Sequence, residues 1–230
     1  MLRVGAETFE SVLDLVTYFR EKHAIGHAKS KLILVLFDGA GLMRLGLERC
    51  GHICVGVELD PVAHHLGQYV GSGNCIQGDA TKCKHFIPLF DCVHASPPCQ
   101  KRSAAAAPHN KSLKRSAFET DHLTWCYNLL SEFPDKYILI ENIRSWCKAG
   151  NTWGEIYNAA QFTQNVAIQN RNRCFGGRYP KPGVLKSPCP PSFVLRGKDF
   201  GPPCIHRHWK LFFVRIFNGR QKGKQESSTV

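Results

Sequence analysis

Leu32-Ile-Leu-Val-Leu-Phe-Asp-Gly-Ala-Gly41 decides the fold, because it joins a continuous apolar run to a glycine-rich turn. An apolar run of this kind is typical of a strand that is buried on both faces of a sheet. The glycines that follow allow the backbone to approach a ligand closely. A helix is expected directly after the turn, over residues 42–50. This order of strand, turn and helix predicts the first unit of an α/β sheet, with a ligand at the turn.

Strands and helices alternate at short spacing along most of the chain. Further strands are expected at residues 53–57, 74–77, 90–95 and 137–140, and further helices at residues 7–20, 119–133 and from Pro61 onward. Alternation of this kind argues for an α/β fold with a mostly parallel sheet. Residues 171–208 are rich in proline, so loops and short strands are expected there, with a last strand at residues 210–217.

Polar or glycine-rich sequence follows each expected strand. In open α/β sheets, ligands bind at the carboxyl ends of the strands. One crevice should therefore hold the residues that end these strands: Gly39, Gly41, Glu58, Asp79, Cys99 and Glu141. Glu58 lies 17 residues after Gly41, which suits a carboxylate that accepts hydrogen bonds from ribose hydroxyls. No Lys-Ser/Thr follows the glycines, so the turn is not a phosphate-binding P-loop.

Cys99 has the strongest chemical signature in the sequence. It follows Pro97 and Pro98 at the end of an expected strand, a position that holds a thiol rigidly and exposes it to the crevice. The thiolate is the nucleophilic form, and five Lys and Arg residues between Gln100 and Glu119, with no acid among them, favour it. A structural thiol is the commoner role for a cysteine in isolation, and the motifs around this one argue against that role.

Charge is distributed unevenly. The formal net charge is +12, and residues 171–230 hold 13 Lys and Arg residues against two acids, Asp199 and Glu226. A neutral body with a strongly basic end predicts binding to a polyanion, above all nucleic acid, which would weaken as salt rises. The alternative is a solvated basic surface followed by a charged tail.

The cysteines and the apolar segments indicate where the protein resides. No apolar stretch approaches the roughly 20 residues of a membrane span, and the N-terminal residues lack the apolar core of a signal peptide. An intracellular protein that is neither secreted nor membrane-bound is expected, with its 11 cysteines reduced. No metal is expected: packing cysteines and DNA-facing histidines are preferred to a zinc site because the spacing is loose at Cys174, Cys189, Cys204, His206 and His208.

Six motifs in order resemble those of the cytosine-C5 DNA methyltransferases. That family has F-x-G-x-G, an acid after the second strand, an acid after the third, P-C-Q, E-N-V and Q-x-R-x-R. The chain shows Phe37-x-Gly39-x-Gly41, Glu58, Asp79, Pro98-Cys99-Gln100, Glu141-Asn142-Ile143 and Gln169-x-Arg171-x-Arg173. The resemblance spans residues 32–180 and is strongest to the short forms of bacteriophages and large DNA viruses such as iridoviruses.

The resemblance implies a defined reaction on double-stranded DNA. A cytosine would be flipped into the pocket, and Cys99 would add to its C6. Glu141 would bind N3 and the amino group, Arg173 would hold O2, and Arg171 would support the nucleophile loop. C5 would take a methyl group from S-adenosylmethionine, which leaves as S-adenosylhomocysteine. The implied substrate-side residues also include Ser96, Pro98, Gln100 and Asn142, of which Asn142 suits a strut better than a reactant.

The implied fold is the Rossmann-like, doubly wound, mostly parallel sheet of S-adenosylmethionine-dependent methyltransferases, with a small irregular C-terminal lobe. The cofactor would lie over Phe37, with Glu58 on the ribose, Leu59 against adenine and Asp79 at its amino group. The remaining residues implied at the cofactor are Asp38, Gly39, Gly41, Ala80 and Pro97. Asp38 replaces the small residue usual in the family, and a role in capping the next helix is slightly preferred to a cofactor contact.

The resemblance divides the chain into three parts. Residues 1–170 would form the catalytic domain, residues 171–217 a minimal basic lobe for DNA recognition, and residues 218–230 a flexible basic tail. The family's last motif is not visible after residue 210, and the space for target recognition is small. Two alternatives stay open: a tRNA or other RNA cytosine methyltransferase, and a DNA-binding relative with weak or no catalysis. Oligomeric state is left open as monomer or dimer.

Overall fold

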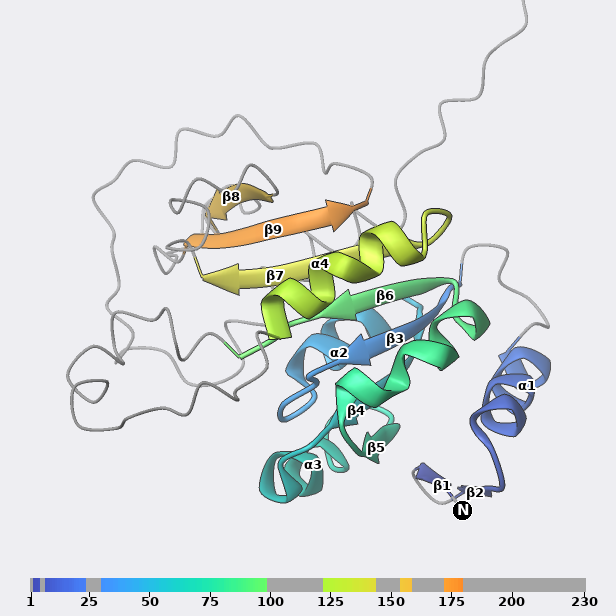
Figure 1. Cartoon of the computed structure of the whole chain (residues 1–230). Coiled ribbons are helices and arrows are strands. Elements are labelled where there is room, and N and C mark those ends of the chain that lie inside the picture. The colour runs from blue at the N-terminus through green and yellow to red at the C-terminus, as the bar shows by residue number, and fades with distance from the viewer. Residues whose placement is uncertain are drawn as a thin grey trace, which may run out of the picture.

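A seven-stranded sheet forms the centre of the structure, in the spatial order β5-β4-β3-β6-β7-β9-β8 (Figure 1). The computed structural model describes residues 2–4, 7–23, 30–98, 122–143, 154–158 and 172–179. Five neighbouring strands run parallel: β5 (Cys75–Gln77), β4 (Ile53–Glu58), β3 (Leu32–Leu36), β6 (Cys92–Ala95) and β7 (Tyr137–Ile143). Two antiparallel strands, β9 (Asn172–Arg178) and β8 (Gly154–Asn158), extend the sheet beyond β7. The predicted α/β class with a Rossmann-like, doubly wound, mostly parallel sheet is confirmed.

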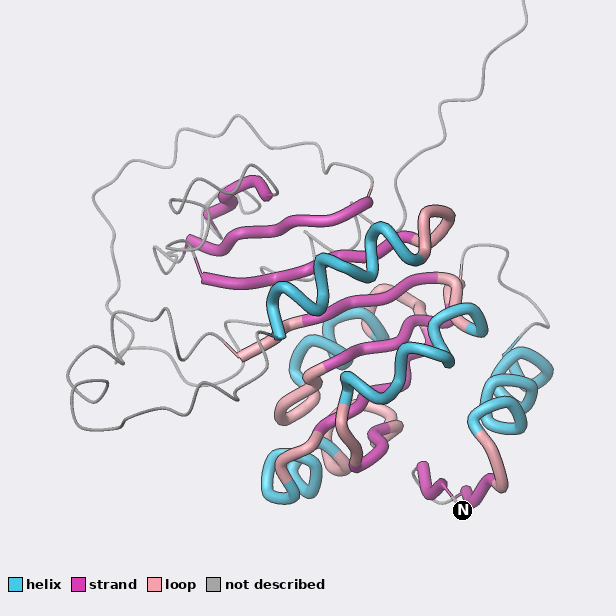
Figure 2. The backbone as a smooth tube through the Cα atoms, in the orientation of Figure 1, coloured by secondary structure: helices cyan, strands magenta, loops and turns pink. Residues whose placement is uncertain are grey.

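Both faces of the sheet are covered, as the uninterrupted apolar run of β3 requires. Leu32, Leu34 and Leu36 face one core, and Ile33 and Val35 face the other. Successive side chains of a strand point to opposite faces, so a strand buried on both must be apolar throughout. The first core packs against α1 (Val12–His23), the 3-10 helix η1 (Ala80–Leu89) and α4 (His122–Glu132), and the second against α2 (Leu42–Glu48) (Figure 2). The remaining helix, α3 (Pro61–Gly67), lies beside β4 and β5.

The N-terminal segment differs from the single helix expected over residues 7–20. Strand β1 (Leu2–Val4) pairs with β2 (Glu7–Phe9) as an antiparallel hairpin, and α1 begins only at Val12. The Ser11 backbone N–H donates to Asp14 Oδ2 at 2.9 Å, and the Asp14 N–H donates to Ser11 Oγ at 3.1 Å. This reciprocal cap satisfies donors that the first helical turn leaves unpaired. The cap therefore sets the start of the helix at Val12. Apolar periodicity alone places the start too early, at residue 7.

Residues 172–178, at the start of the expected basic lobe, form β9 within the same sheet as the catalytic motifs. Residues 180–230, including the expected last strand and basic tail, lie outside the described residues. The expectation that every cysteine is reduced is wrong for Cys174, which is fully buried in β9 and disulfide-bonded. Sequence spacing cannot reveal which thiols the fold brings together. Six other described cysteines are in no disulfide: Cys50, Cys54, Cys75, Cys83, Cys92 and Cys126.

His94 makes the stability of the fold sensitive to acid. It lies fully buried on β6, and burial lowers its pKa to about 3. The unfolded chain protonates this histidine near its ordinary pKa of about 6.5. Unfolded chains therefore bind more protons than folded ones between pH 6.5 and 3. The contribution of His94 to stability is complete above pH 6.5 and is lost as the pH falls below that value. We expect this one residue to remove about 2 kcal/mol of unfolding free energy between pH 6.5 and pH 5.

Urea denaturation at pH 7 and pH 5 tests this expectation on wild type, on His94→Gln and on His85→Gln, an exposed control on η1. His94→Gln should lose less unfolding free energy than wild type on acidification, by about 2 kcal/mol, whereas His85→Gln should follow wild type. The assignment to His94 is wrong if all three proteins show the same dependence on pH.

Candidate active site at the carboxyl edge of the sheet

The strand order reverses between β3 and β6, and this point marks the ligand crevice of an open α/β sheet. The loops that leave these two adjacent strands begin at Phe37 and Ser96, and the Ser96 N–H donates to the Leu36 carbonyl at 3.2 Å. Strand β4 ends beside them at Glu58, and Glu141 lies near the end of β7. The structure thus brings most of the predicted strand-end residues to one edge.

The turn after β3, residues 37–41, has an unusual backbone. Phe37, Gly39 and Gly41 have φ angles of 58°, 59° and 80°, all in the left-handed region. Glycine adopts these angles readily, but a bulky residue such as Phe37 rarely does, and strained residues persist where the surrounding structure holds them. A Cβ added to Gly39 would meet nothing within 4 Å. The turn is therefore tightly shaped and open above Gly39, as a site that admits a ligand against the backbone requires.

Glu58 connects the end of β4 to this turn. Its Oε2 accepts from the Gly39 N–H at 2.7 Å, and its Oε1 accepts from the Asp60 N–H at 2.8 Å. The carboxylate is therefore held in one orientation, and each oxygen keeps a second lone pair for a ligand hydroxyl. Leu59, beside it, is 64% exposed. This pair provides an oriented acceptor and an uncovered apolar surface, which suit the ribose and the base of a nucleoside.

Asp79 follows β5 and caps the 3-10 helix η1. Its Oδ1 accepts from the Thr81 N–H at 2.9 Å and from the Thr81 hydroxyl at 2.7 Å. Partial burial acts to raise the pKa of this carboxyl, but the two hydrogen bonds outweigh it and the pKa is lowered. Asp79 is therefore an anion at neutral pH, available to accept from an amino group. Ala80, the next residue, is buried.

His122, at the start of α4, is a site residue that sequence reasoning missed. Its ring lies against Phe37 with 5.3 Å between centroids, and its charge acts to lower the pKa of Asp79. It therefore stands between two of the predicted cofactor residues. A histidine at a helix start has no pattern in the sequence that marks it, because its neighbours come from β3 and from the end of β5.

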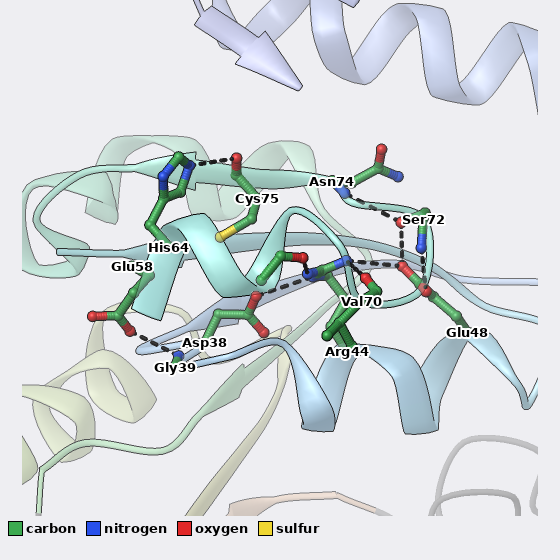
Figure 3. Close-up of polar contacts among 11 residues, drawn as sticks. Asp38, Gly39, Arg44, Glu48, Glu58, His64, Val70, Ser72, Asn74 and Cys75 are labelled. Carbon is green, nitrogen blue, oxygen red and sulfur yellow. Dashed lines mark hydrogen bonds and ion pairs between the residues drawn. The ribbon is translucent and has the colours of Figure 1, made fainter. Parts of the chain in front are cut away.

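The preferred role of Asp38, capping α2, is wrong. Helix α2 begins after Gly41, with no side-chain hydrogen bond at the cap. Asp38 instead points into the protein, where its Oδ2 accepts from Arg44 Nε at 3.0 Å (Figure 3). Burial raises the pKa of the Asp38 carboxyl, and the charge and hydrogen bond of Arg44 act against that rise. The carboxylate satisfies a buried cation, and this tertiary contact outweighs the local cap.

A second cluster lies at the same edge of the sheet, around Glu141. The Ser96 hydroxyl donates to Glu141 Oε2 at 2.7 Å, and Arg173 Nε contacts Glu141 Oε1 at 2.7 Å. Both charged side chains are less than one-fifth exposed, at 17% and 19%. The antiparallel register of β7 with β9 pairs Ile143 with Arg173, which makes Glu141 its diagonal neighbour on the same face. The fold therefore joins residues from two separate motifs and a third strand end.

Asn142 braces the loop that leads toward Cys99. Its Nδ2 donates to the Pro97 carbonyl at 3.2 Å, and both residues are buried. Pro98, the next residue, is exposed. These contacts support a strut for Asn142 and place Pro97 against β7. Three predicted site residues, Cys99, Gln100 and Arg171, lie outside the described residues.

Neither a metal-binding cluster nor a membrane-spanning helix occurs in the described part of the chain. Among those residues, no group of three or more His, Cys, Asp or Glu side chains is arranged to hold a metal ion. Cys189, Cys204, His206 and His208 lie outside it. None of the described helices has the length and apolar character needed to cross a membrane.

Solved structures that are similar to the chain include two Dnmt2 proteins and a prophage-encoded protein. Schizosaccharomyces pombe Dnmt2 is 17% identical, with 64% of this chain and 48% of that chain covered and a TM-score of 0.45. A Spodoptera frugiperda DNMT2 mutant is 17% identical, with 64% of this chain and 50% of that chain covered and a TM-score of 0.46. A protein described as a DNA modification methyltransferase, encoded in an E. coli prophage, is 21% identical. The match covers 63% of this chain and 45% of that chain, with a TM-score of 0.40. The chain spans about half the length of these proteins. No curated protein is significantly similar to the chain.

A family model matches more than half of the chain. It covers residues 33–164 and describes the C-5 cytosine-specific DNA methylases. The matched range runs from β3 through the turn at Phe37–Gly41, the end of β6 and the Glu141 region. The chain therefore belongs to the C-5 cytosine-specific DNA methylase family of S-adenosylmethionine-dependent methyltransferases.

Proposed function

We propose that the chain is a DNA (cytosine-5)-methyltransferase that acts on double-stranded DNA through a covalent adduct of Cys99. The observation that carries the proposal is the Glu141 cluster, in which one oriented carboxylate meets Ser96 and Arg173 at 2.7 Å each. A carboxyl group placed here can accept from the amino group of a cytosine and can give a proton to its N3. Its position beside the loop toward Cys99 supports a single pocket for the edge and the ring.

Each residue on the substrate side has a separate role in the reaction. Cytosine is flipped out of the duplex, because its ring carbons are not accessible while it is stacked. The Cys99 thiolate bonds to C6 as the C5=C6 double bond opens, Glu141 gives a proton to N3, and Arg173 holds the O2 oxygen. Arg171 supports the nucleophile loop, and Asn142 braces it through Pro97. After methylation, a base takes the C5 proton, the C5=C6 double bond re-forms as the Cys99 thiolate leaves C6, and N3 returns its proton to Glu141.

The residues on the other side of the crevice fit S-adenosylmethionine. Phe37 and the open backbone at Gly39 would lie beneath it, Glu58 would accept from its ribose, and the Asp79 carboxylate would accept from its adenine amino group. The uncovered Leu59 would pack against the base, and His122 beside Phe37. When bound, the cofactor supplies an electrophilic methyl group to C5.

Double-stranded DNA as the substrate rests on charge and on family membership. Residues 171–230 hold 13 Lys and Arg residues and two acids, enough positive charge to neutralise several phosphates. We assign residues 171–217 to DNA recognition and residues 1–170 to catalysis, with β9 as the strand that joins the two parts. The resemblance to short viral forms supports a role on viral DNA within a host cell.

Mechanism-based trapping tests the proposal. The full chain is incubated with labelled S-adenosylmethionine and a DNA duplex in which 5-fluorocytosine replaces cytosine, with tRNA carrying the same base in parallel. Fluorine at C5 cannot leave as a cation, so the final elimination stops and the enzyme stays bonded to the base. We expect a labelled adduct on the duplex that survives denaturation.

The parallel incubation with tRNA shows whether DNA or RNA is the substrate. An adduct on tRNA and none on the duplex would replace DNA with RNA as the substrate. Absence of transfer and adduct on both, with S-adenosylhomocysteine still bound, would overturn the proposed catalysis in favour of a binding relative.

A further inference from the structure

A buried ion pair lies directly beneath the proposed cofactor turn. Arg44 of α2 is 0% exposed and Asp38 is 6% exposed, and their contact of 3.0 Å has no access to solvent at either side chain (Figure 3). Removing both charges from water carries a large desolvation penalty, so such a pair contributes little to stability compared with apolar residues of similar size. Its presence at this position calls for another role.

The Arg44 guanidinium connects the turn to two further segments. Nη2 donates to the Gly67 carbonyl at the end of α3 at 2.7 Å, and Nη1 donates to the Val70 carbonyl at 3.0 Å. Nη1 also lies 3.5 Å from Glu48, whose carboxylate accepts from the Ser72 backbone N–H at 2.9 Å. One side chain therefore fixes the turn, the end of α3 and the 70–72 segment relative to one another (Figure 3).

Glycines clear the space that this pair occupies. A Cβ at Gly41 would lie 2.5 Å from Arg44 Nη2, and a Cβ at Gly56 would lie 2.2 Å from Asp38 Oδ2. Gly56 lies in the middle of β4 and has no positive φ, so its backbone does not require glycine. The Asp38 carboxylate is the group that a side chain there would displace. The glycines of strand β4 and of the turn thus leave room for the ion pair.

The pair acts on the part of the turn that meets the ligand. Asp38 lies between Phe37 and Gly39, both left-handed, and the Gly39 N–H is held from the other side by Glu58 at 2.7 Å. Strained backbone persists only where its surroundings over-determine it. We propose that Asp38 and Arg44 are positioning residues that hold Phe37 and Gly39 in the cofactor-binding conformation without touching the cofactor. This inference rests on the proposed use of S-adenosylmethionine at the turn.

The test separates positioning from stability with a neutral double variant. Asp38→Asn/Arg44→Met removes both charges of the pair at similar size, and Glu48 keeps its hydrogen bond from the Ser72 N–H. Arg49→Met is the matched control, because Arg49 is exposed at the end of the same helix. S-adenosylhomocysteine affinity is measured by calorimetry, and the folded fraction by circular dichroism and urea titration. We expect the double variant to bind about tenfold or more weakly while folded, since small displacements of binding groups have large effects, and Arg49→Met to match wild type.

The steady-state constants KM and kcat distinguish a positioning role from a purely structural one. KM for S-adenosylmethionine should rise in the double variant, while kcat at saturating cofactor should stay within about threefold, because the Glu141 cluster is untouched. Unchanged affinity in the folded double variant overturns the inference. If that variant does not fold, Arg44→Lys decides in the same way, because it keeps the charge but cannot reach three acceptors. Failure of wild type to bind S-adenosylhomocysteine would instead reject the proposed function.

Discussion

Replacing Cys99 with serine should abolish methyl transfer and the trapped adduct on 5-fluorocytosine DNA, with a loss of about 10³-fold or more, because a hydroxyl is a far weaker nucleophile than a thiolate. DNA affinity should stay within about twofold, since phosphate contacts supply most of it. Pro97, two residues earlier, is held by Asn142 against β7, so the substitution changes the nucleophile and not the anchoring of its loop.

Cys50→Ser is the matched control, because Cys50 is a half-buried thiol outside any disulfide, just after α2, where it donates to the Gly46 carbonyl. It should retain wild-type transfer. Both variants are assayed for label transfer, for the adduct and for duplex binding in a salt titration. If Cys99→Ser keeps a substantial fraction of the activity, the covalent mechanism is wrong. If it loses DNA binding as well as transfer, the role assigned to Cys99 is not that of a nucleophile alone.

The parallel core of the fold could be predicted because its signals are local. The run at residues 32–36 is apolar on both faces, and a turn of left-handed residues follows it directly. The antiparallel order at the other edge could not be predicted, since β9 inserts between β7 and β8 although β8 comes first along the chain. Pairing of that kind depends on contacts between distant segments, which no periodicity records.

The same contrast between local signals and distant contacts applies to the residues of the candidate site. Glu58, Asp79 and Glu141 could be proposed as site residues because each follows an expected strand. Asp38 was misassigned, because its true partner depends on space cleared by Gly56 on the neighbouring strand. The ion pair of Glu141 with Arg173 follows from the register of β9, which the two motifs do not encode. Sequence thus marked the residues at strand ends, and the tertiary structure decided which of them act together.

The pairing of Glu141 with Arg173 leads to the second large effect, on the substitution Glu141→Gln. Glutamine keeps an acceptor for the Ser96 hydroxyl but loses the charge that Arg173 contacts at 2.7 Å. Its amide also has no proton to give to the cytosine N3 when the thiolate adds to C6. We expect the single-turnover rate of transfer to fall by about 10²- to 10³-fold, the loss typical of removing one oriented electrostatic group. Duplex affinity should change little.

The double variant Glu141→Gln/Arg173→Gln shows whether the two residues act as a unit. Groups that act together are strongly non-additive, so it should lose far less than the product of the two single losses. Glu21→Gln, on the exposed face of α1, serves as the control for removing a carboxylate and should behave as wild type. Adduct formation on 5-fluorocytosine DNA should slow in parallel with transfer, because Glu141 acts at the addition step. A variant that forms the adduct at the wild-type rate would move Glu141 out of the chemistry and leave it only a contact to the base.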